Sequence, residues 1–171
     1  MTMPTLTGEE LYAWVERTSS GWRELLTAHP EALTLPCNIR ASTTVAGLLQ
    51  HIAAVELLFT EWLSGIPATP AAEPSSATPE TTYATIYATH DKAMSLFLNL
   101  NQHDEAWWQE QVDFPMRSGA ILHGPRRVFA IHMLMHSIRH YAQLATIVRQ
   151  HGITPNWQMD YLGMIMPPAK G

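Results

Sequence analysis

The stretch between Arg127 and Arg139 constrains the fold most, because no residue between these two arginines carries a permanent charge. Its apolar residues occupy almost every side of a helical wheel. Gly124-Pro125 and His151-Gly152 are the start and stop signals of a helix. A helix that is apolar nearly all round must be buried, so the rest of the chain has to supply elements that surround it.

Three further segments carry apolar residues at the three- and four-residue spacing of an amphipathic helix. They span residues 7–29, 43–63 and 78–100, with a Thr7–Glu10 capping box at the start of the first and a Thr78-Pro79 start signal for the third. No stretch between them alternates for long enough to predict a sheet. The sequence predicts an all-α fold, a four-helix bundle with long connecting loops, in which residues 1–171 form a single domain.

The connecting segments are less regular. Residues 65–78 are rich in Pro, Ala, Ser and Thr, which predicts a loop. Trp107 and Trp108 are expected in a short helix, and residues 114–122 in a short extended excursion. The tail, residues 153–171, is expected to pack back over the bundle through Trp157, Tyr161 and Leu162.

Composition excludes several classes of protein. The net charge is −5 with ten Lys and Arg and no basic cluster, which argues against nucleic acid as a partner. No apolar run reaches the length of a membrane span, and the first residues lack the features of a signal peptide, so a cytoplasmic protein without membrane contact is expected. The single cysteine, Cys37, rules out an internal disulfide and a thiolate zinc site. The low content of charged residues, 15%, and the apolar tail suggest a homodimer.

Nine histidines are the unusual feature of the composition, and three of them recur in the last helical segment. His132, His136 and His140 are spaced by four residues, so that adjacent members share a helix face. Two imidazoles one turn apart can bind the same divalent cation. The spacing alone leaves open which pair does so.

His51 is the expected third ligand. It shares a face of the second helical segment with Leu48, Val55 and Trp62, and therefore points into the bundle. For any single buried histidine, a hydrogen bond to a carbonyl or hydroxyl is the more common arrangement. The coincidence of inward faces on two helices favours a shared metal ion instead. The other histidines lie where capping or surface roles suffice: His29, His90, His103, His123 and His151.

Other catalytic patterns are absent from the sequence. No histidine has Glu three positions before it, as a di-iron bundle requires, and His-Glu-x-x-His does not occur. There is no glycine-rich phosphate loop and no Gly-x-Ser-x-Gly motif.

Two motifs resemble the DinB/YfiT-like superfamily of metal-binding four-helix bundles. They are Leu49-Gln50-His51-Ile52, followed by Glu56 and Trp62, and His136-Ser137-Ile138-Arg139-His140-Tyr141-Ala142-Gln143. The resemblance implies that His51, His136 and His140 bind a divalent ion, and leaves His132 as a candidate supporting residue beside the ligands. The superfamily often has His-Arg-Gly-Gln after the last ligand. Here Gln143 is retained, whereas the arginine and the glycine are replaced.

Proteins of this superfamily include thiol S-transferases and isomerases. The resemblance implies a metal-dependent enzyme acting on a small molecule, with zinc or nickel and a low-molecular-weight thiol as cofactors. A metal-bound thiolate would attack an electrophile, and a hydrolase using metal-activated water is chemically just as available. Tyr141, Gln143 and Trp62 are expected to line the substrate pocket. The alternative is a non-enzymatic metal- or haem-binding bundle with a structural ion.

Overall fold

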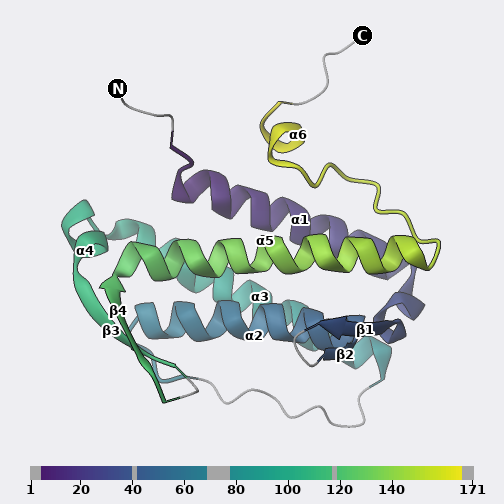
Figure 1. Ribbon diagram of the computed structural model, residues 1–171, viewed down its shortest axis with the longest axis horizontal. Helices are drawn as coiled ribbons and strands as arrows, with labels where there is room; N and C mark the ends of the chain where they lie inside the picture. Colours follow the sequence, from purple (N-terminus) through teal and green to yellow (C-terminus); the bar gives the residue numbers. More distant parts are fainter. Residues whose placement is uncertain (1–4, 40–41, 69–77, 117–118, 167–171) are drawn as a thin grey trace.

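Four long helices lie side by side along the long axis of the molecule (Figure 1). The computed structural model describes residues 5–39, 42–68, 78–116 and 119–166. The long helices are α1 (Gly8–Ala28), α2 (Val45–Leu63), α3 (Pro79–Asn99) and α5 (Arg126–Gln150). The short helices are η1 (Pro30–Thr34), η2 (Leu100–Gln102), α4 (Glu105–Gln109) and α6 (Tyr161–Ile165). Helix α2 packs against α3 and α5, and α1 packs against α5.

Local capping signals place the helix ends close to where the sequence predicts them. Thr7 and Glu10 form the expected capping box of α1. Thr44 caps α2 by accepting a hydrogen bond from the Gly47 N–H, and Thr78 caps α3. The backbone of Gly152 has a φ of 80°, the left-handed conformation that glycine adopts after a helix end.

The long helices bury two clusters of apolar side chains. One gathers around Trp22 and Leu144, and the other around Val15 and Met133. Helix α5 contributes to both, yet Met135 is 55% exposed. The burial expected all round this helix is therefore incomplete. Among the described residues, no helix is long and apolar enough to cross a membrane.

Two small antiparallel hairpins depart from the all-α prediction. Strands β1 (Pro36–Ile39) and β2 (Ser42–Thr44) form one, and β3 (Gln111–Pro115) and β4 (Ile121–Pro125) form the other. These strands are too short for an alternating pattern to be recognised in the sequence. The second hairpin is anchored instead by a tertiary contact, the stacking of Phe114 on Phe59 of α2. Trp107 and Trp108 lie in α4, as predicted.

The C-terminal segment packs against α1, as expected. The indole of Trp157 lies edge-on to Trp22 and directly over Gly21, where a Cβ atom would not fit. Trp14 donates from Nε1 to the carbonyl oxygen of Met159 at 2.7 Å. Leu162, in contrast, is exposed. The predicted loop 65–78 and tail lie partly outside the described residues, at 69–77 and 167–171.

A chain of polar side chains, three of them buried and the fourth, Glu16, partly exposed, links all four long helices. The carboxylate of Glu56 in α2 is 0% exposed; it accepts a hydrogen bond from Ser137 Oγ of α5 at 2.7 Å and contacts His90 Nδ1 of α3 at 2.7 Å. The other ring nitrogen, Nε2 of His90, lies 3.0 Å from Glu16 Oε1 of α1. A buried charge is tolerated only when it is paired and hydrogen-bonded. The hydrogen bonds of this network therefore fix how the four helices are aligned with one another.

His90 should keep its positive charge across the neutral range. Burial alone would lower the pKa of His90, but the negative charges and hydrogen bonds of Glu56 and Glu16 outweigh burial and raise the pKa to about 10. The folded pKa lies above the unfolded value of about 6.5. The stabilising contribution is therefore complete below pH 6.5 and is lost as the pH rises through 10.

We predict that replacing His90 by Asn removes this pH dependence and lowers the free energy of unfolding at pH 7 by about 3–5 kcal/mol, because Glu56 is left buried without a counter-charge. Urea denaturation between pH 6 and pH 10 would measure both effects. His123→Asn is the matched control, since the His123–Asp113 pair is exposed and should contribute little. Equal losses in the two variants would show that the buried pair has no special role.

Candidate metal centre

Three histidine rings from two helices converge on one point. Nε2 of His136 lies 3.2 Å from Nε2 of His51 and 3.1 Å from Nε2 of His140. The donor atoms of all three lie within 4.8 Å of one another, and the group could hold a metal ion. The structure thus brings together the three residues that the sequence predicts as ligands.

Helix geometry and the buried network together produce this convergence. His136 and His140 are one turn apart on α5, so their rings stand on the same face. His51 comes from α2, which faces them. Ser137, the residue after His136, is hydrogen-bonded to Glu56 of α2. That contact holds the two helices in the register that places His51 opposite its partners.

Gln143 determines which nitrogen of His140 is available to a cation. Nδ1 of His140 lies 2.6 Å from Oε1 of Gln143. An amide oxygen can only accept a hydrogen bond, so with this amide orientation Nδ1 carries the proton. Nε2 is then left with a lone pair that points at the other two histidines. A metal-binding histidine in proteins almost always has such a partner on its second nitrogen.

The surroundings of His136 favour a neutral imidazole. Burial, followed by the nearby charges of His140, His51 and Arg139, together lower the pKa of His136 to about 3. Within the described part of the chain, the buried Nδ1 of His136 has no hydrogen-bond partner. Neutral nitrogen donors are the form that zinc and nickel bind. The donor set therefore fits a divalent transition-metal ion.

Arg139 and His132 border the three histidines on α5. The Arg139 guanidinium lies 3.3 Å from Nε2 of His140. The ring of His132 is farther away, 6.1 Å from that of His136, and also lies beside Phe59. Burial and the charge of Arg139 lower the pKa of His132. His132 is thus next to the cluster but outside the set of donors that could share one ion.

The residues expected to line a substrate pocket lie in different surroundings. Tyr141 is buried in the core and stacks on Trp22, so it faces α1 and not the histidines. Trp62 packs on Phe114 and Phe129. Gln143 contacts His140. Tyr141 is thus buried against α1, whereas Trp62 is partly buried against neighbouring aromatic rings, and their part in a substrate pocket stays a prediction.

His90 was expected to be a surface or capping residue, and this expectation is wrong. It is 2% exposed and lies between two glutamates. The sequence does contain a signal for its burial: His90 comes three residues after Tyr87 and four before Met94, which are both on the apolar face of α3. Its carboxylate partners come from other helices and could not be read from this spacing.

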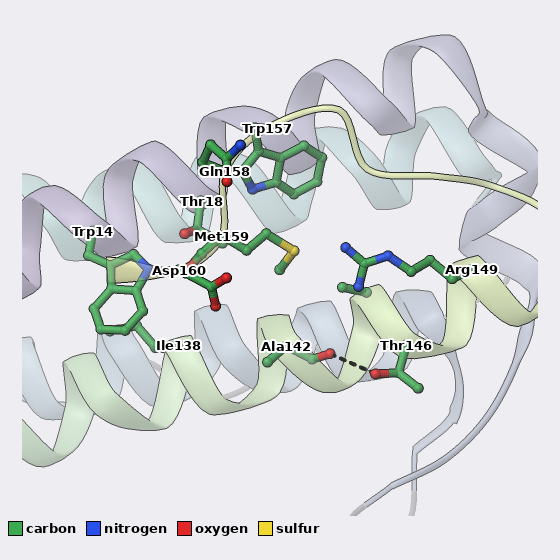
Figure 2. A pocket seen from close by; sticks show the side chains of 11 residues that line it. Trp14, Thr18, Ile138, Ala142, Thr146, Arg149, Trp157, Gln158, Met159 and Asp160 are labelled. Carbon is green, nitrogen blue, oxygen red and sulfur yellow. Dashed lines mark hydrogen bonds between the residues drawn. The ribbon is translucent and has the colours of Figure 1, made fainter. Parts of the chain in front are cut away.

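A separate cavity lies on the opposite side of α5, between α1 and the C-terminal segment (Figure 2). Its volume is about 550 Å³. Ile138, Ala142 and Arg149 line it from α5, and Trp14 and Thr18 from α1. None of the three clustered histidines borders it. The faces of α5 therefore serve two different environments.

Comparison with known proteins supports the assignment made from the motifs. No curated protein matches the chain. The model of the DinB family matches residues 1–168, which is nearly the whole sequence. The fold, mostly helical with small sheets, and the cluster of three histidines agree with this match. The chain belongs to the DinB family.

Proposed function

We propose that this protein binds a divalent metal ion through His51, His136 and His140. The observation that carries the proposal is the convergence of three Nε2 atoms from α2 and α5, one of them oriented by Gln143. We also propose that residues 1–171 fold as one domain, a four-helix bundle. The side-by-side packing of the four long helices supports it.

We further infer that the protein is a metal-dependent enzyme acting on a small molecule, of the thiol S-transferase or isomerase type. Three protein ligands are typical of catalytic zinc sites, whereas closed structural sites use four. A zinc or nickel ion held there would act as a Lewis acid that lowers the pKa of a thiol or a water molecule. The protein itself contributes three imidazole donors and a fixed His140 tautomer.

Other activities are compatible with the same donors. A hydrolase would use the same three imidazoles, and so would a non-enzymatic bundle with a structural ion. No contact in the described residues favours haem over a single ion. The homodimer and the cytoplasmic location remain predictions from the sequence.

The proposed function is tested by metal analysis of the untagged protein followed by thiol-transfer assays on a panel of small electrophiles. We expect about one equivalent of zinc or nickel, with transfer that is lost after chelation and restored by the metal. Full metal content without any metal-dependent transfer or hydrolysis would instead favour the structural ion.

Two substitutions one turn apart on α5 test the choice of ligands. His136→Ala removes the central donor and should reduce metal content to near zero. His132→Ala should leave most of the metal bound, because its ring lies outside the cluster. Metal content by elemental analysis, with circular dichroism to verify folding, would measure the difference. Equal losses would show that the wrong members of the histidine triplet were chosen.

Gln143→Ala tests the orientation of His140. Without the amide oxygen, the His140 ring loses the partner that fixes its tautomer, and we expect metal affinity to fall by about 10- to 100-fold. Gln150→Ala, an exposed position at the end of the same helix, is the matched control. Competition with a coloured chelator would measure the affinities. Unchanged affinity in Gln143→Ala would exclude this role.

A further inference from the structure

Arg139 lies beside the three histidines and pairs with no carboxylate of the described part of the chain. Its side chain is exposed, and its guanidinium lies 3.3 Å from Nε2 of His140. Arg23 and Arg126 form ion pairs with Asp91 and Glu110. For Arg139, no carboxylate of the described residues lies within ion-pair distance.

Positive charge would exceed negative charge around the site once a cation is bound. The three imidazoles contribute no negative charge in either protonation state. The buried carboxylate of Glu56 is already paired with His90. A divalent cation held by the histidines would therefore add two positive charges next to Arg139. Such a site attracts an anion from solution.

Arg139 and a metal ion would compete for the same lone pair. Nε2 of His140 has one lone pair, and Nδ1 is occupied by Gln143. If that lone pair binds a cation, the guanidinium N–H has to turn to another acceptor. Its exposed side chain can do so while remaining at the site. A guanidinium recognises a carboxylate through two parallel hydrogen bonds, a geometry that a lysine does not reproduce.

We propose that Arg139 selects the small molecule by binding its carboxylate, so that the site takes a thiol that carries a carboxylate in preference to a neutral thiol. This inference rests on the proposed metal site. The superfamily arginine that follows the last ligand is absent here, because Tyr141 follows His140. The role in specificity is therefore assigned to a different position, Arg139, which comes directly before His140.

The test uses the full-length protein loaded with Co²⁺, whose visible absorption reports changes at the metal. The protein is titrated with 3-mercaptopropionate and with 2-mercaptoethanol. We expect the carboxylate-bearing thiol to bind about tenfold more tightly to the unmodified protein, as one charged hydrogen-bonded contact implies. Arg139→Gln should abolish this preference, and Arg139→Lys should retain part of it. Arg149→Gln is the control, because Arg149 lines the cavity on the opposite side of α5 (Figure 2).

Each outcome separates the two proposals. If Co²⁺ binds but the unmodified protein shows no preference, or Arg139→Gln keeps it, the role of Arg139 is overturned and the metal site stands. If the carboxylate of the thiol bound the cation directly, Arg139→Gln would keep the preference. If Co²⁺ does not bind at all, the proposed function fails and the inference fails with it. Loss of the preference in Arg149→Gln as well would also overturn it.

Discussion

The buried carboxylate of Glu56 is the interaction on which the arrangement of the helices depends. It is fully enclosed, and its two oxygens are satisfied by Ser137 on one helix and His90 on another. Removing either partner would leave a charge or an acceptor buried without compensation, which costs far more than an exposed pair. The two clusters of buried apolar side chains hold the helices together but do not specify how the helices are aligned along their axes. The polar network does specify it, because its hydrogen bonds tolerate little sliding.

The histidine cluster follows from that register. His51 meets His136 and His140 only if α2 and α5 are aligned as the Glu56–Ser137 contact aligns them. Three imidazoles in a largely apolar region lose water and need compensation. A shared divalent cation would satisfy three lone pairs at once, and Gln143 satisfies the second nitrogen of His140. The network that stabilises the bundle and the proposed metal site are thus neighbouring parts of one polar core.

Helix α5 has different roles on its different sides. One face carries the proposed ligands and, at its edge, Arg139. Another packs on α1 through Tyr141, and a third borders the cavity of Figure 2. The uncharged stretch between Arg127 and Arg139 supplies part of these faces, including His136 and Ile138, and most of its positions are not exposed. Met135 is exposed, so the apolar residues of α5 extend past the faces that other described residues bury.

The sequence by itself determined the features that depend on neighbours within one or two helical turns. These are the four long helices, their threonine caps, and the shared face of neighbouring histidines on α5, all of which follow from local spacing because helix geometry repeats every few residues. The hairpin that Phe114 anchors, the pairing of His90 with Glu16 and Glu56, and the packing of Tyr141 and Trp62 on neighbouring aromatic rings were decided only by the tertiary structure. Each of these depends on a partner far away in the sequence. The spacing of residues within one helix does not show which side chains of another helix will pack against it.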